Sequence, residues 1–194
     1  GTGAPSDAPG RRSGLRRWLP RDPYTTAAWL VFISIVIYCW TGFTEGDEEI
    51  YFLGSRRIHD PGFLALDFTW SRLPPTSALF DHLLAPLWSF CDAFTIAILG
   101  RLIFWGLMAW STVFLARTIR LAAWTVVIGF AIWLLWGETF VTCGAPFIGF
   151  QVKSFAYPLI FFSLGFAMRV QTFRARLAAG LGTAFHIVVG GRAM

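Results

Sequence analysis

Residues 93–116, AFTIAILGRLIFWGLMAWSTVFLA, contain a single charged side chain, Arg101. A helix of about 20 predominantly apolar residues is long enough to cross the hydrocarbon core of a bilayer. The whole chain has the same character, since 56% of its residues are hydrophobic and 14% are charged. A soluble domain carries roughly 25% charged residues. We therefore expect an all-α, polytopic transmembrane helical protein.

Four other apolar segments predict further membrane spans. In the first of them, Trp29 and Trp40 lie near the two ends, where indole rings suit the interfaces between lipid and water. The odd number of spans and the apolar ending predict that the chain is the N-terminal part of a longer protein. The predicted organisation begins with a disordered basic cytoplasmic tail over 1–24 and a first transmembrane helix over 25–43. An extracytoplasmic loop with interfacial helices follows over 44–92. Transmembrane helices two to five occupy 93–194, and the last three of them cover 121–136, 155–170 and the residues from 177 onward.

Charged residues fall on alternate sides of these spans. Basic connections remain in the cytoplasm, so we expect a cytoplasmic N-terminus in the bacterial inner (plasma) membrane. The net charge of +5 alone would suit nucleic acid, but this alternation indicates the lipid bilayer as partner and no nucleic acid. The basic side comprises Arg11, Arg12, Arg16, Arg17, Arg21, Arg117, Arg120, Arg169, Arg174 and Arg176. The acidic side comprises Glu45, Asp47, Glu48, Glu49, Asp60, Asp67, Asp81, Asp92 and Glu138.

The long loop after the first span has signals for short helices. Thr44 and Asp47 have the spacing of a capping box, which predicts that a helix begins there. Asp60-Pro61-Gly62 predicts its end. Leu73-Pro74-Pro75 then prevents another helix until about Thr76, a candidate N-cap. The apolar run 78–90 is typical of a helix lying along the membrane interface.

The acidic run Asp47-Glu48-Glu49, followed by Tyr51, opens this loop beside the first span. Carboxylates this close together repel one another, and they persist most readily where they bind a cation or accept a proton. The run therefore indicates chemistry at the membrane face, with a divalent metal as a candidate cofactor. The alternative interpretation is an ordinary solvated loop.

The order of these features resembles the start of GT-C-type integral membrane glycosyltransferases. Those enzymes have a first span, an outer loop that opens with Asp-Glu-x-x-Tyr, and interfacial helices. The matching residues are Asp47, Glu48 and Tyr51. A weaker match is Arg72-Leu73-Pro74-Pro75, which stands where aminoarabinose transferases carry Lys-Pro-Pro.

A closer resemblance, over about residues 25–194, is to poorly characterised bacterial multi-spanning membrane proteins. Each of their motifs is short, and only the order of the motifs is distinctive. In this chain the motifs are Glu49 with Tyr51, Asp60-Pro61-Gly62-Phe63-Leu64, Asp67-Phe68, Lys153-Ser154-Phe155-Ala156-Tyr157, and His186 with Gly190.

The resemblance implies transfer of a sugar from a polyprenyl-phosphate-linked donor on the extracytoplasmic side. Such a reaction needs a base for the acceptor and positive charge for the phosphate leaving group. Asp47 and Glu48 are the candidate catalytic residues. The candidate substrate-binding residues are Glu49, Tyr51, Asp67, Arg72, Arg101 and Lys153.

Less specific interpretations remain open for these residues. Arg101 either faces a lipid phosphate, or snorkels outward, or pairs with Asp92 or another carboxylate. Lys153 either binds phosphate or anchors a span at the headgroups. For the whole chain, the alternatives are a transporter or channel module, with a polar route between the two faces, and a non-catalytic membrane scaffold.

Overall fold

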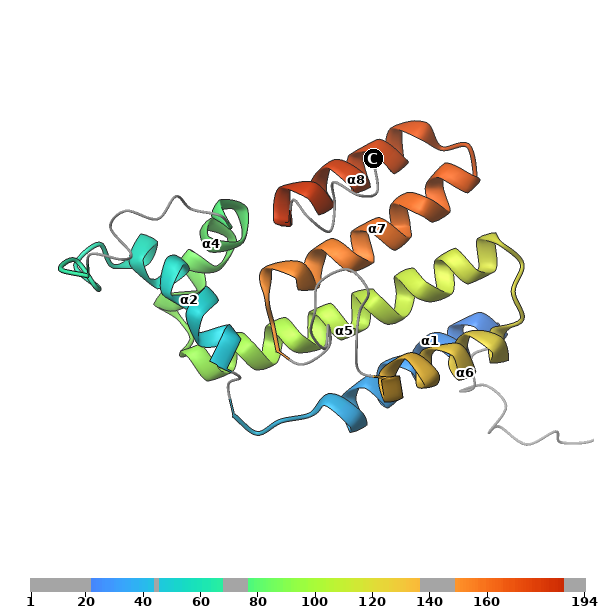
Figure 1. The fold of residues 1–194 in the computed structure, drawn as a ribbon, viewed down its shortest axis with the longest axis horizontal. Helices are drawn as coiled ribbons and strands as arrows, with labels where there is room; N and C mark the ends of the chain where they lie inside the picture. The colour runs from blue at the N-terminus through green and yellow to red at the C-terminus, as the bar shows by residue number, and fades with distance from the viewer. Residues whose placement is uncertain (1–21, 44–45, 68–76, 137–148, 187–194) are drawn as a thin grey trace, which may run out of the picture.

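The computed structural model describes residues 22–43, 46–67, 77–136 and 149–186, and these ranges are helical with connecting turns. The expected all-α class is confirmed for this part of the chain. Figure 1 shows a layered arrangement of long helices with a group of short helices at one end. The elements are α1 (Pro23–Cys39), α2 (Gly46–His59), α4 (Ala78–Leu84), the 3₁₀ helix η2 (Ala85–Ser89), α5 (Ala93–Thr118), α6 (Ala123–Trp136), α7 (Val152–Met168) and α8 (Thr172–Phe185).

Helix α5 is the longest described helix and the axis of the fold. Its 26 residues extend about 39 Å at 1.5 Å per residue. The side chain of Asp92 caps its N-terminus by accepting a hydrogen bond from the backbone N–H of Thr95 at 2.8 Å. Among the described helices, α5 alone is both long and apolar enough to cross a bilayer, while α1, α6 and α7 are apolar but shorter. The predicted segment 93–116 is thus confirmed as a helix, two residues longer than expected.

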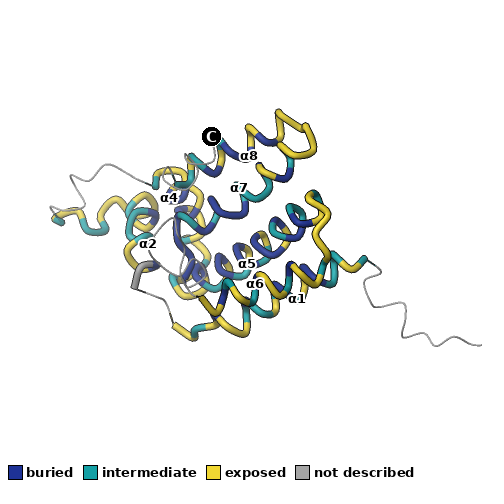
Figure 2. Tube along the Cα trace, turned by 45° about the vertical axis from the view of Figure 1, so that its right-hand side comes forward, coloured by how far each residue is buried: buried dark blue, intermediate teal, exposed yellow. Residues whose placement is uncertain are grey.

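The other long helices cover α5 from two sides. Helix α1 packs against α5 and α6, whereas α7 packs against α5 and carries α8 on its far side (Figure 1). The side chains of Phe104, Trp105 and Met108 in α5 are completely buried. Figure 2 shows the buried positions along α5 and α7, with exposed positions on the outer helices.

Two glycines permit close helix contacts. At Gly100, a Cβ atom would lie 2.2 Å from the ring of Phe150, and at Gly165 it would lie 2.5 Å from the ring of Phe114. Phe150 itself is buried in an aromatic cluster with Phe52, Phe80 and Phe155, with ring centroids 5.2–6.3 Å from its own. Because the aromatic cluster fills this space, α5 can approach the segment before α7 only at Gly100, where α5 has no side chain.

Helices α2, α4 and η2 form a cap at the N-terminal end of α5 (Figure 1). The indole N–H of Trp88 in η2 donates to the hydroxyl of Ser55 in α2 at 2.9 Å. Helix α2 ends before Asp60, as the Asp-Pro-Gly sequence predicts. The predicted interfacial helix is divided, because Pro86 lies in the first turn of η2 and converts the second half to 3₁₀ geometry.

Three helices begin earlier than the sequence predicts. Asp22 caps α1, and Pro23 at the first helical position sets the start of that helix. Trp40 is extended, so α1 also ends four residues before the predicted Phe43. The capping box of Gln151 and Ser154 starts α7 at Val152. Helix α8 starts at Thr172 rather than 177, which places Arg174 and Arg176 within the helix.

The capping box expected at Thr44 and the N-cap expected at Thr76 lie outside the described residues, and Ser77 is the N-cap of α4.

Candidate functional site

A buried ion pair joins α2 to α5. The carboxylate of Glu48 accepts two hydrogen bonds from the guanidinium of Arg101, at 2.7 Å from Nε and 2.5 Å from Nη2. The side chains are 0% and 3% exposed. Two parallel hydrogen bonds of this kind fix both the distance and the orientation of the two groups.

The remaining polar atoms of the pair are also bonded. Arg101 Nη1 donates to the hydroxyl of Thr41 at 2.7 Å and to its carbonyl at 3.2 Å, and Nη2 donates to the carbonyl of Phe43 at 3.0 Å. The backbone N–H of Phe150 donates to Glu48 Oε1. The ion pair therefore connects four parts of the chain: the exit of α1, α2, α5 and the segment that leads into α7. Such complete bonding offsets the cost of removing two charges from water.

This geometry answers the open question about Arg101. Among the predicted alternatives, the structure shows pairing with a carboxylate, and the partner is Glu48. Asp92 instead caps α5. Because the side chain of Glu48 is completely buried and paired with Arg101, Glu48 would have to leave this arrangement to reach a substrate.

The other described site residues belong to α2, to the turn after it and to α7. Glu49 is exposed, whereas Tyr51, Asp67 and Lys153 are half-buried. Lys153 lies in the first turn of α7 and interacts electrostatically with His186 at the end of α8. Two motifs of the family resemblance are thus close together in space. The side chain of Asp47 and all of Arg72 lie outside the described residues.

A polar cavity of about 610 Å³ lies between the C-terminal end of α2, η2 and the start of α5. Its charged, polar and aromatic lining residues are Arg56, His59, Asp60, Trp88 and Asp92. Sequence reasoning missed Arg56, His59 and Trp88. The available signal was the i, i+3 spacing of Arg56 and His59, which places them on one face of a helix that is followed directly by an aspartate.

Several lining residues of the polar cavity are held in place. The guanidinium of Arg56 lies 4.3 Å from the ring centre of Phe63 in the turn after α2 and 5.5 Å from that of Trp88 in η2, so two aromatic faces support it. Asp60 Oδ1 accepts a hydrogen bond from the N–H of Gly62 at 3.0 Å. Hydrogen bonds from Thr95 lower the pKa of Asp92, which keeps its carboxylate ionised.

The lining residues offer complementary chemistry to a polyhydroxylated ligand with a phosphate. Carboxylates accept hydrogen bonds from hydroxyl groups, and arginine donates to phosphate. An indole ring supplies an apolar face for the ring of a sugar. Among the described residues, no three His, Cys, Asp or Glu side chains are grouped closely enough to hold a metal ion.

Asp81 in α4 is a second buried acid near this end of the molecule. It is 4% exposed, and its Oδ1 has no hydrogen-bond partner among the described residues. Its Oδ2 accepts from the hydroxyl of Ser77 at 2.9 Å. Burial raises the pKa of this carboxyl above its ordinary value of 3.8. The side chain packs against Gly54 of α2, where a Cβ would lie 2.8 Å from it.

Comparisons with protein-family models, with curated proteins and with solved structures found no match to this chain.

Proposed function

We propose that this chain is a polytopic inner-membrane protein whose polar cavity binds the head group of a polyprenyl-phosphate-linked sugar. The sugar is transferred to an acceptor on the extracytoplasmic side, as in the GT-C-type glycosyltransferases that the sequence resembles. The single observation that carries the proposal is the position of this cavity, at the N-terminal end of the helix that is long enough to span a membrane.

The distribution of charge along α5 supports the proposed orientation. At its C-terminal end, Arg117 pairs with Asp22 at 3.2 Å, and Arg169 donates to the hydroxyl of Thr118 at 2.9 Å. This end is basic, and the positive-inside rule places it in the cytoplasm. The opposite end, with Asp60 and Asp92, then faces away from the cytoplasm.

The surfaces of the long helices support membrane embedding. Large apolar side chains are exposed on α1, α5 and α6, including Ile37 (77%), Ile103 (55%) and Ile128 (59%). Lipid would cover side chains of this kind, and a contiguous exposed apolar surface is unusual for a soluble monomer. In this arrangement α1, α6 and α7 also lie within the bilayer.

Within the cavity we assign distinct roles. Arg56 holds the donor phosphate, and Trp88 stacks on the sugar ring. Asp60 or Asp92 accepts the proton of the acceptor hydroxyl, in line with the general-base chemistry that transfer requires. Glu48 and Arg101 are positioning residues, because their ion pair fixes α2 relative to α5, the two walls of the cavity.

The residues assigned through the family resemblance are also part of this proposal. Asp47 is one residue from Glu48 and remains a candidate base. Glu49, Tyr51, Asp67, Arg72 and Lys153 remain candidate substrate contacts. A divalent metal would require ligands from this same set.

The test measures binding and transfer separately in nanodiscs that contain the full chain. A polyprenyl-phosphate sugar is titrated against the wild type and against Asp60→Asn, Asp92→Asn and Trp88→Ala. Asparagine at position 60 retains the turn to Gly62, and asparagine at position 92 retains the helix cap. We expect Trp88→Ala to weaken binding by roughly tenfold, equivalent to about 1.4 kcal/mol, and at least one of the aspartate variants to lose transfer. Unchanged binding in all three variants would refute the cavity as the site.

A specific observation also favours a second function, a non-catalytic membrane scaffold that binds the donor. Both oxygens of Glu48 accept hydrogen bonds in the ion pair, so the best-placed acid of the predicted run has a structural role. Binding of the donor without transfer by the full chain would select this second function.

A further inference from the structure

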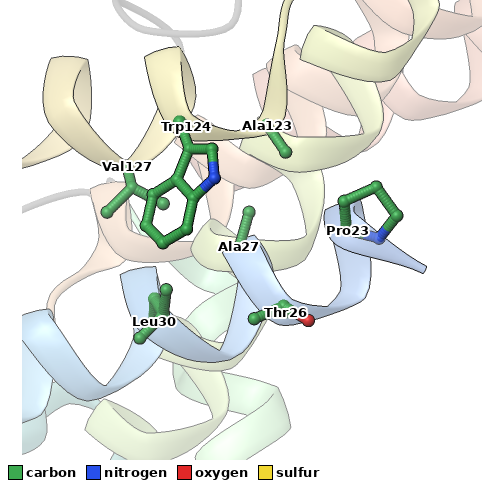
Figure 3. Close-up of a pocket in the computed structure, with 7 residues that line it drawn as sticks. All are labelled: Pro23, Thr26, Ala27, Leu30, Ala123, Trp124 and Val127. Atoms are coloured by element: carbon green, nitrogen blue, oxygen red, sulfur yellow. The ribbon is translucent and has the colours of Figure 1, made fainter. Parts of the chain in front are cut away.

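An apolar groove of about 180 Å³ lies between α1 and α6 (Figure 3). It lies near the starts of these two helices, at the opposite end of the molecule from the cap (Figure 1). Ala27 and Leu30 of α1 line one side, and Trp124 and Val127 of α6 line the other. Trp124 is 67% exposed, so the groove has an open apolar wall. We call this feature the α1–α6 groove.

Two arginines lie at the rim of the α1–α6 groove. Arg117 pairs with Asp22, which directly precedes the lining residue Pro23. Arg120 is exposed and directly precedes Leu121, whose carbonyl accepts a hydrogen bond from Tyr24 at 2.9 Å. This bond joins the starts of α1 and α6 beside the groove. Asp22 balances the charge of Arg117, so Arg120 gives the rim its net positive charge, while the interior is apolar.

The backbone holds Arg120 in an unfavourable conformation. Its φ of 60° is in the left-handed region, which favours glycine. The turn is a Schellman motif, since Leu121 N–H donates to the carbonyl of Ala116 at 2.9 Å and Arg120 N–H donates to that of Arg117 at 3.3 Å. The same motif ends α7, with Val170 at a φ of 60°.

We propose that the α1–α6 groove binds one anionic membrane phospholipid, with an acyl chain between the two helices and the phosphate at Arg117 and Arg120. Charge complementarity selects this occupant. The apolar walls suit hydrocarbon, and basic side chains between membrane helices on the cytoplasmic side bind anionic head groups. The inference rests on the proposed membrane embedding but not on the proposed sugar transfer.

The test uses native mass spectrometry of the full chain released from detergent with added lipid. Phosphatidylglycerol and phosphatidylcholine with identical acyl chains are the two probes. The wild type retains phosphatidylglycerol in preference to phosphatidylcholine. Arg120→Gly removes one charge and fits the left-handed turn, and we expect it to weaken phosphatidylglycerol binding roughly fivefold. Val170→Gly is the matched control, because it makes the same backbone change without changing charge, and it leaves lipid binding unchanged.

A second variant tests the apolar part of the site. Ala123→Phe fills the groove and should reduce the binding of both lipids. Equal retention of the two lipids by the wild type would overturn the proposal, as would equal phosphatidylglycerol binding by Arg120→Gly and Val170→Gly. A dimer that Ala123→Phe dissociates would instead identify a second copy of the chain as the occupant. Binding of the polyprenyl-phosphate sugar in the same samples separates failure of this site from failure of the polar cavity.

Discussion

At the scale of single residues, the ion pair of Glu48 and Arg101 decides how the cap is attached to α5. An arginine within an apolar helix is costly in a membrane, and here it is neutralised by a carboxylate from a separate helix. Removing one partner leaves an uncompensated buried charge, which is more damaging than removing both.

We therefore predict that Glu48→Gln lowers the free energy of unfolding by about 3 kcal/mol. The double variant Glu48→Gln, Arg101→Met should be less destabilised than the sum of the two single variants. Unfolding of the detergent-solubilised chain measures all three. Glu49→Gln is the matched control, because it removes the same charge at an exposed neighbouring position. Equal losses in Glu48→Gln and Glu49→Gln would contradict the structural role of the ion pair.

Asp81 gives a prediction with a defined dependence on pH. Since its folded-state pKa lies above the ordinary value of 3.8, the folded protein holds this proton more tightly than the unfolded chain. The free energy of unfolding must therefore fall as the pH rises from about 3.8 through the raised pKa. Asp81→Asn removes this loss, so we expect that variant to be more stable than the wild type at neutral pH. Below about pH 3.8 the two proteins should unfold alike.

Asp92 is the contrasting case. Its pKa is lowered by hydrogen bonds from Thr95, so its ionised form stabilises the folded state at neutral pH. Asp92→Asn should reduce stability there, and the difference from the wild type should disappear as the pH falls through the lowered pKa. Shifts of the same sign in Asp81→Asn and Asp92→Asn would contradict the assigned environments. Thermal unfolding between pH 3 and pH 7 provides the comparison.

At the scale of helices, small residues decide where α5 can be approached. Gly100 and Gly106 lie in the same helix, but a Cβ at Gly100 would collide with Phe150, while one at Gly106 would meet nothing within 4 Å. Phe150 is buried and also donates its N–H to Glu48, so it has little freedom to move aside.

We predict opposite effects of alanine at these two positions. Gly100→Ala should destabilise the protein by about 1–3 kcal/mol through overpacking. Gly106→Ala should be neutral or stabilising by up to about 1 kcal/mol, because alanine has the higher helix propensity. Equal stability of the two variants would show that α5 and Phe150 are not in contact. The same unfolding assay measures both.

Some helix boundaries and contacts were predictable from the sequence, and others were not. Helix α5 was predictable because 93–116 is apolar apart from Arg101, and the end of α2 was predictable from Asp60-Pro61-Gly62. The start of α1 was missed because Asp22 and Pro23, which determine it, were assigned to the polar tail. The partner of Arg101 was not predictable, because Glu48 is distant in sequence and only tertiary packing brings the two side chains together.

At the scale of the whole molecule, the two ends of α5 have different chemistry. One end carries the cap, the ion pair and the polar cavity, which is lined by Asp60 and Asp92 together with Arg56 and His59. The other carries Arg117, Arg120 and the α1–α6 groove. This polarity is the basis for placing a sugar head group at one membrane face and an anionic phospholipid at the other.

Labelling of single cysteines in intact cells tests this orientation most directly. In a background with Cys39, Cys91 and Cys143 replaced by serine, Leu66→Cys reports the turn after α2, and Leu121→Cys reports the turn between α5 and α6. Both native side chains are exposed, at 101% and 41%. We predict that a membrane-impermeant maleimide labels Leu66→Cys in intact cells and labels Leu121→Cys only after the membrane is opened. Labelling in the reverse pattern would place the polar cavity in the cytoplasm and contradict the proposed function.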